Sequence, residues 1–334
     1  MEAANLQYYI RCTCQSISAI SVAECTFNAT VHLAVGIRSR EGSALVLEQL
    51  QQPLSFLNSD DATLEETARW LMPDGSAVIL LKAVGSFRQR FDVRAFPFET
   101  LVCAFEVTSS VPSSAPTAVE GKGRAPTVAL ASTEHPESGH TYGKHVIFVE
   151  RNFSCVDMFT FLGSSHSTSK SAVAESASGK VYDVIEFRYA MRRRPQFYVW
   201  NILLPTCTLS ALNFVVFRLS PEDFADRLSV TLTLLLTMAA YKFTVADKLP
   251  PVSYLTLADI YVLLCFALTV TITLENAWAT DQSAAADRTA CLVIGAVWLA
   301  ANALVVMFCI WKYLQGRAKT VGRWAARSSR IQAT

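Results

Sequence analysis

The chain has 334 residues, of which 51% are hydrophobic and 17% charged, and its formal net charge is +1. The near-neutral balance gives no indication of a nucleic-acid partner, and the apolar content is high for a soluble protein. Almost all long apolar runs lie after residue 196. The sequence therefore predicts a polar half followed by a membrane half.

Alternating apolar residues predict β-strands in the first half. Residues 27–35 alternate strictly, and residues 181–191 alternate again. Short β-prone runs lie at residues 78–81, 102–107 and 146–149. Short strands separated by turn residues predict an antiparallel β-sandwich. Two stretches rich in Ser with Pro, Gly or Ala, residues 109–145 and 164–180, are predicted to be long surface loops.

The polar half carries few features that point to chemistry. Nine cysteines show no metal-type spacing, and the five histidines form no pattern with a nucleophile. We therefore expect no enzyme, no cofactor and no metal site. Pairing among the five cysteines of the polar half stays open, because connectivity does not follow from sequence. The trio His135, His140 and His145 leaves metal chelation or pH sensing as alternatives to a solvated loop.

Signals for export are weak. Asn28 and Asn152 each begin a glycosylation sequon. The segment from Met1 to Ile10 has neither the basic start nor the apolar core of a signal peptide.

Four apolar segments in the second half are predicted to cross a lipid bilayer. They cover residues 197–217, 226–247, 254–277 and 290–314, and a basic tail covers residues 315–334. Each segment has about the 20 residues that a membrane helix needs. The first contains Pro205, and the link from the third to the fourth is short.

The second segment has a polar stripe that lipid would not favour. Residues at steps of three, four or seven share one face of a helix. On that face lie Ser229, Thr233, Leu236, Ala240 and Asp247, and further hydroxyls stand at Thr237 and Thr244. Asp226 and Asp247 stand at the two ends, where carboxylates of several copies would ring the mouths of a pore. The alternative is a bundle helix whose hydroxyls bond to neighbouring helices.

Motifs across most of the chain resemble the pentameric ligand-gated ion channels, also called the Cys-loop receptor superfamily. The segment from Phe91 to Glu99, FDVRAFPFE, is similar to the family's loop that presses on the membrane domain. The other matching positions are Arg193 with Pro195, Pro205, Asp226 with Arg227, Leu236, Asp247 and Pro250.

The resemblance implies a fold, a topology and an assembly. Residues 1–191 would form an extracellular antiparallel β-sandwich, residues 192–314 a transmembrane four-helix bundle, and residues 315–334 a basic tail. Each subunit would join four further subunits, the same or homologous, around a central pore in the plasma membrane. The Lys and Arg residues of the tail favour the cytoplasm under the positive-inside rule, whereas the resemblance places both termini outside.

The resemblance also implies roles for single residues. Leu236 falls at the gate, and Asp226 stands where the family's cation channels carry an acid, so permeant monovalent cations are expected; Asp247 would lie at the outer mouth. The implied pore lining is Ser229, Thr233, Leu236, Ala240 and Thr244. The implied domain-coupling residues are Phe96, Pro97, Phe98, Glu99, Arg193 and Pro250. A buried Arg193 would need a carboxylate partner, and Asp92 and Glu99 are the candidates.

The chain departs from the animal members of the family. Cys103 matches the second cysteine of the family's signature disulfide, but Gln89 stands where the first would fall. The disulfide cannot form at this pair, and with the short third-to-fourth link this is similar to bacterial members. The aromatic ligand box is also poor: Tyr182 matches one position and Phe56 lies near another, but Ser110 stands in place of a tryptophan. The agonist, a small molecule or a proton, stays open.

Three other functions are weighed beside a ligand-gated cation channel. A non-conducting or accessory subunit of the same fold fits the poor ligand box. An anion-selective member would have the same fold but different residues in its selectivity ring. An unrelated four-span adhesion or junction protein would form no ring.

Overall fold

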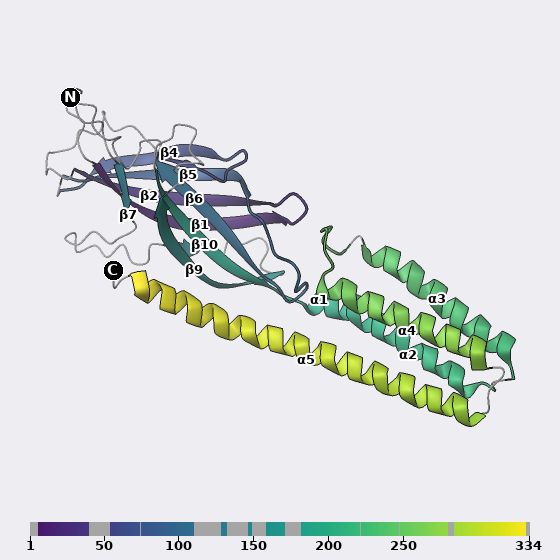
Figure 1. Ribbon diagram of the computed structural model, residues 1–334. Helices are drawn as coiled ribbons and strands as arrows, with labels where there is room; N and C mark the ends of the chain where they lie inside the picture. The colour runs from purple at the N-terminus through teal and green to yellow at the C-terminus, as the bar shows by residue number, and fades with distance from the viewer. Residues whose placement is uncertain are drawn as a thin grey trace, which may run out of the picture. The chain divides into compact units, whose positions relative to one another are not determined.

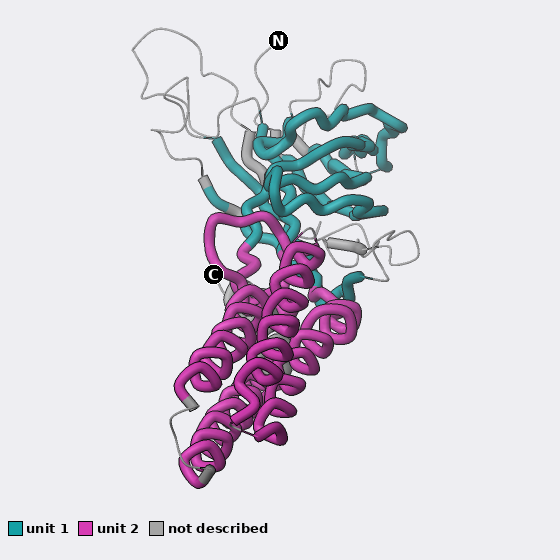
Figure 2. The backbone as a smooth tube through the Cα atoms, turned by 90° about the vertical axis from the view of Figure 1, so that its right-hand side faces the viewer, with its two compact units in different colours: residues 1–91, 102–191, 320–334 teal, residues 92–101, 192–319 magenta. Residues whose placement is uncertain are grey.

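The computed structural model describes residues 6–39, 54–73, 75–109, 128–131, 146–148, 158–170, 182–220, 222–246, 248–279 and 284–331. The chain divides into two compact units, one of residues 1–91, 102–191 and 320–334, the other of residues 92–101 and 192–319 (Figure 2). Residues 92–101 thus group with the helices, although they lie between strands in the sequence.

Two β-sheets build the first unit (Figure 1). Strands β4, β5, β2, β1 and β7 lie in this order in one sheet, where β8 also pairs with β1, and β3, β6, β10 and β9 form the other. The strands are β1 Leu6–Ser21, β2 Thr26–Ser39, β3 Leu54–Phe56, β4 Thr63–Leu71, β5 Ala77–Arg88, β6 Thr100–Ser109, β7 Val128–Ala131, β8 Val146–Phe148, β9 Phe159–Lys170 and β10 Asp183–Arg193. The predicted β-sandwich is confirmed. Only the short β7 and β8 pair parallel, both with β1, among the described pairings.

The core between the sheets is aromatic. Phe27 of β2 lies 5.5 Å from Phe87 and 5.3 Å from Phe105 between ring centroids, so the rings join both sheets. The Tyr189 hydroxyl of β10 donates to the Cys12 carbonyl of β1 at 3.3 Å. Burial raises the pKa of the Cys12 thiol to about 12, so that it stays protonated at neutral pH. Cys12, Cys14 and Cys25 of this unit are free thiols.

The sequence predicted part of this sandwich. The strand predictions for residues 27–35, 78–81 and 102–107 are confirmed within β2, β5 and β6. The loop prediction is wrong for residues 128–131 and 164–170, which belong to β7 and β9. A Ser-rich strand such as β9 is stabilised by backbone pairing at the sheet edge, which composition does not report. Asn152, Cys155 and the trio His135, His140 and His145 lie outside the described residues.

Helices form the second unit, apart from residues 320–331 at the end of the last helix, which group with the first. They are α1 Gln196–Tyr198, the π-helical η4 Val199–Leu203, α2 Leu204–Leu212, the 3-10 helix η5 Asn213–Arg218, α3 Phe224–Ala246, α4 Leu257–Ala279 and α5 Ala284–Ile331. Four stretches are long and apolar enough to cross a membrane, residues 196–218, 224–246, 257–278 and 285–311. The four predicted spans are confirmed. The π turn ends two residues before Pro205, whose ring clashes with the carbonyl four residues earlier and widens the helix there.

Helix α5 is longer than its apolar span. It has 48 residues and continues to Ile331, through most of the predicted basic tail. Alanine and arginine, which are frequent in this part, have high helix propensity. The sequence analysis did not predict this continuation.

Gly85 offers a test of the sandwich packing. Its φ is +155°, and an added Cβ would lie 2.4 Å from Ala62 Cα, whereas Gly163 has φ +159° with nothing within 4 Å. The backbone strain is matched, so the comparison isolates the clash. We expect Gly85→Ala to lower the free energy of unfolding by about 1–3 kcal/mol more than Gly163→Ala, measured by unfolding of the purified chain. Equal losses would contradict this packing.

Candidate functional site: the pore helix and the coupling loop

Helix α3 has two opposite faces. Its buried residues recur at helical spacing and are Arg227, Thr231, Met238 and Val245. Met238 packs with Tyr261 and Cys265 of α4, and Val245 packs with Ile202 and Val262. This face joins α3 to the rest of the bundle.

The predicted stripe lies on the other face of α3. Its described members Ser229, Thr233, Leu236 and Ala240 are exposed, and so is Thr244 of the predicted pore lining. Leu236 is 72% exposed in the single chain, so its surroundings must come from lipid, another subunit or a pore. This exposed face could meet other copies of the chain around a symmetry axis.

The hydroxyls of the stripe bond to their own helix. Thr233 donates to the Ser229 carbonyl at 2.7 Å, and Thr237 donates to the Thr233 carbonyl at 2.7 Å. Thr244 donates to the Ala240 carbonyl at 3.3 Å. These contacts differ from the alternative of hydroxyls that hold neighbouring helices, and they leave the hydroxyl oxygens on the exposed face able to accept bonds from water.

The acid and base at the start of α3 point apart. Asp226 is exposed, whereas Arg227 is fully buried and forms an ion pair with Asp287 of α5 at 2.7 Å. Consecutive residues of a helix lie about 100° apart around its axis, which permits this separation. The second predicted selectivity residue, Asp247, lies outside the described residues.

A buried ion pair lies at the predicted coupling residues. Arg193 Nε donates to Glu99 Oε1 at 2.5 Å, with the two side chains 8% and 2% exposed. The guanidinium also lies over the Phe96 ring at 5.2 Å and the Tyr198 ring at 5.6 Å. Of the two candidate partners Glu99 is the one used, while Asp92 accepts a bond from the Arg94 backbone. Glu99 Oε2 is buried without a hydrogen-bond partner.

The same loop supplies the missing acceptors at the start of α4. The first N–H groups of a helix have no partner within it. Leu257 N donates to the Arg94 carbonyl at 3.0 Å, and Ala258 N donates to the Phe96 carbonyl at 3.2 Å. Thr256 and Asp259 complete the N-terminus by reciprocal side-chain bonds. Movement of either the loop or α4 would therefore break bonds that the other needs.

The remaining predicted residues have less specific surroundings. Pro97 follows a cis peptide bond and is buried, and Phe98 N donates to the Ala95 carbonyl at 2.7 Å. Pro250 is half-buried. Phe56 is 9% exposed and its ring packs 5.2 Å from Phe87, so most of it belongs to the sandwich core. Tyr182 is half-buried just before β10, and Ser110 lies outside the described residues.

Three residues that the sequence analysis missed complete these contacts. Tyr198 belongs to none of the predicted motifs, and its hydroxyl accepts a hydrogen bond from Arg193 Nη1 at 3.4 Å. The Tyr254 hydroxyl accepts a bond from Val93 N at 3.1 Å. Asp287 binds Arg227. A signal existed for each, because tyrosines at the ends of apolar spans and an acid beside one commonly have specific partners.

The membrane half matches a known family. Residues 202–284 match the family model described as "Neurotransmitter-gated ion-channel transmembrane region". The human 5-hydroxytryptamine receptor 3E is 37% identical over 112 residues, 34% of this chain and 24% of that protein. The gamma-aminobutyric acid receptor subunit theta of Mus musculus is 25% identical over 216 residues, 63% of this chain and 30% of that protein.

These matches are partial. The chain spans about a quarter to a third of the length of these two relatives, 24% and 30%. They support the predicted relationship to the Cys-loop receptor superfamily. Together with the fold, they indicate a multi-pass membrane protein with a β-sandwich, whose helices are similar to the transmembrane region of neurotransmitter-gated ion channels.

The Arg193–Glu99 pair gives a stability prediction. Glu99→Ala leaves a buried guanidinium without its carboxylate, which costs about 3–5 kcal/mol. The apparent melting temperature of the purified chain should fall clearly, whereas Asp92→Ala, which removes an exposed carboxylate of the same loop, should change it little. Replacing both partners by Met and Leu should recover much of the loss. A Glu99→Ala protein as stable as Asp92→Ala would exclude the pair as a stabilising contact.

Proposed function

We propose that the chain is a subunit of a ligand-gated, cation-selective ion channel. Five subunits, the same or homologous, surround a pore lined by α3, with the sandwich of residues 1–191 outside the plasma membrane. The observation that carries the proposal is the two-faced α3: one face packs into the bundle, and the opposite face exposes Ser229, Thr233 and Leu236 together. The division into residues 1–191, 192–314 and 315–334 belongs to this proposal.

Leu236 is the gate in this proposal. A ring of leucines in a narrow pore dewets, and a dry constriction blocks ions without a plug. The threonines on either side keep the rest of the lining wettable. The high exposure of Leu236 in the single chain supports this role.

Asp226 is the inner selectivity ring, and Asp247 is an outer ring. Carboxylates at a narrow mouth raise the local concentration of cations such as sodium and repel anions. The exposure of Asp226 and the burial of Arg227 support this assignment, since the base does not share the acid's surface.

Agonist binding at the sandwich opens the pore through the coupling loop. The contacts from Arg94 and Phe96 to the start of α4 support this route, because they tie residues 92–101 to the helices. The agonist is a small molecule or a proton at the subunit interface near Tyr182. The relatives' names contain 5-hydroxytryptamine and gamma-aminobutyric acid, and neither follows from the residues of this chain.

Two alternatives remain within the family. A non-conducting or accessory subunit is favoured by the poor ligand box, and an anion-selective member by the match to relatives of several kinds. The departures at Gln89 and in the third-to-fourth link support a closer similarity to bacterial members.

Current recordings from whole cells test the proposal directly. Cells that express the chain alone are recorded during pH steps and a screen of small ligands, and the particle mass of the purified chain is measured. A pentamer that carries cation current is expected. A chain that stays monomeric both alone and with homologous subunits, or a pentamer that carries no current under any condition, would overturn it.

The gate gives a mutational prediction. Leu236→Ser wets the ring and removes the barrier that keeps the closed pore dry. Channel opening should become easier and closing slower, seen as a lower half-maximal agonist concentration. Leu292→Ser, which changes an equally exposed leucine on α5, a helix outside the proposed pore lining, is the matched control. An unchanged agonist response in Leu236→Ser would exclude the gate role.

The selectivity rings give a second prediction. Asp226→Ala should reduce the preference for sodium over chloride far more than Asp247→Ala. Two unit charges 4 Å apart interact by roughly 4 kcal/mol at an effective dielectric of about 20, whereas salt screens over about 8 Å in a wide mouth. Reversal potentials in salt-dilution experiments measure both variants. A larger effect of Asp247→Ala would reverse the assignment.

A further inference from the structure

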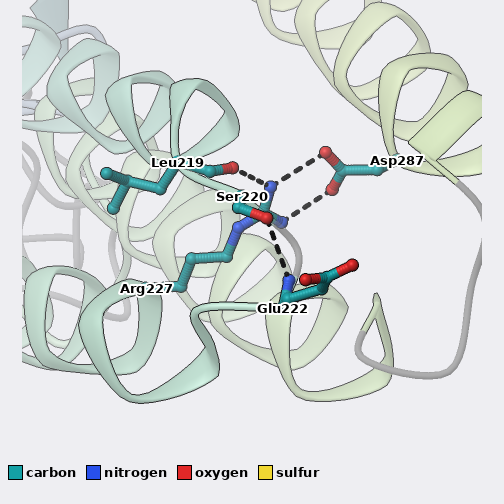
Figure 3. Close-up of polar contacts among 5 residues, drawn as sticks. All are labelled: Leu219, Ser220, Glu222, Arg227 and Asp287. Atoms are coloured by element: carbon teal, nitrogen blue, oxygen red, sulfur yellow. Dashed lines mark hydrogen bonds and ion pairs between the residues drawn. The ribbon is translucent and has the colours of Figure 1, made fainter.

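Arg227 is held by three hydrogen bonds at one end of the bundle. Its Nη1 and Nη2 donate to the two carboxylate oxygens of Asp287 at 2.7 and 2.9 Å. Nη2 also donates to the Leu219 carbonyl at 2.6 Å (Figure 3). The side chain of Arg227 is 0% exposed and that of Asp287 7%. A bidentate pair of this kind fixes the direction of the guanidinium as well as its position.

Asp287 is exceptional on its helix. Among the side chains of α5 that the structure describes, that of Asp287 alone is buried. The most apolar stretch of the span contains no buried residue. Leu292 and Val297 nearby are 73% and 62% exposed. An acid at the edge of an apolar span is costly without a partner and commonly functional. Its one described hydrogen-bonding partner is Arg227, 60 positions away in the chain.

Other acids near the guanidinium do not bind it. Glu275 and Asp223 lie within electrostatic range of Arg227. Glu275 Oε2 is buried without a hydrogen-bond partner, so Glu275 attracts the guanidinium by its charge but does not orient it by a hydrogen bond. Arg227 Nε is buried and unpartnered as well. Among the described residues, the carboxylate of Asp287 and the carbonyl of Leu219 alone set where the guanidinium points.

This contact bears on Asp226, the next residue in the chain. Asp226 is exposed on α3 and Arg227 is turned into the bundle. A guanidinium without its carboxylate is unfavourable in the bundle, and a long arginine stem can carry the charge to nearby water. At the inner mouth that water is the pore entrance, where the freed charge would oppose the Asp226 ring.

We propose that Asp287 is a positioning residue for charge selection: it keeps the positive charge of Arg227 away from the pore entrance from a helix that does not line the pore. The inference rests on the proposed function, because it assigns a determinant of selectivity to α5. It adds that the preference for cations depends on a contact between α3 and α5.

Reversal potentials in salt-dilution experiments on the full chain test this role. Asp287→Asn should lower the permeability ratio of sodium to chloride by roughly tenfold, because in each subunit the released Arg227 charge would offset the carboxylate of Asp226. Asp287→Glu, which keeps the carboxylate, should preserve the ratio. Glu275→Gln is the matched control, because it removes a nearby acid without releasing the guanidinium. A ratio equal to the parent's in Asp287→Asn would overturn the proposal.

A double-variant comparison separates positioning from a general effect of charge. In the Arg227→Gln background, Asp287→Asn should cause no further fall in the ratio, because no guanidinium remains to be released. The same tenfold fall in that background would show that Asp287 acts without Arg227. A parent channel that prefers chloride would refute the proposed cation selectivity, yet Asp287→Asn should still shift its ratio further toward chloride.

Arginine modification gives a readout that needs no current. Treatment of the assembled protein with phenylglyoxal, followed by mass spectrometry, should leave Arg227 protected in the parent and in Glu275→Gln. Arg227 should become reactive in Asp287→Asn and stay protected in Asp287→Glu. Protection of Arg227 in a folded Asp287→Asn protein would overturn the positioning role even if the chain conducts no ions.

Discussion

Each polar group in an apolar helix must find a partner or water, and this constraint organises the membrane half. Arg227 satisfies it at its two terminal nitrogens, which bind Asp287 and the Leu219 carbonyl. The threonines of α3 satisfy it through carbonyls of their own helix. The bundle therefore needs no hydroxyl of the stripe to hold it together. That independence leaves one face of α3 free to line a pore without loss of stability.

The same constraint connects the loop of residues 92–101 to α4. A helix N-terminus presents N–H groups that need acceptors, and the carbonyls of Arg94 and Phe96 supply two of them. The Arg193–Glu99 pair and the Phe96 and Tyr198 rings surround this junction. The loop is thus part of the helical unit by its bonds. A signal that passes along it would act on backbone contacts rather than on single exposed charges.

The two opposite charges at the start of α3 point in different directions. An adjacent acid and base would largely cancel if both faced the same water. The structure exposes Asp226 and buries Arg227, and the buried pair costs desolvation that two strong hydrogen bonds offset. Such a pair is a weak source of stability, which favours a role in placing charge. The selectivity of the proposed channel is then a property of the bundle as well as of its lining.

Local periodicity was sufficient for much of this protein. The alternation of residues 27–35 and the apolar lengths of four segments predicted the sandwich and the spans, because side-chain direction repeats with backbone geometry. The stripe of α3 followed from the same rule. Partner choice did not follow. Glu99 rather than Asp92 binds Arg193, and Asp287 binds Arg227 across 60 positions, since the path of the chain, not its local pattern, decides which distant groups meet.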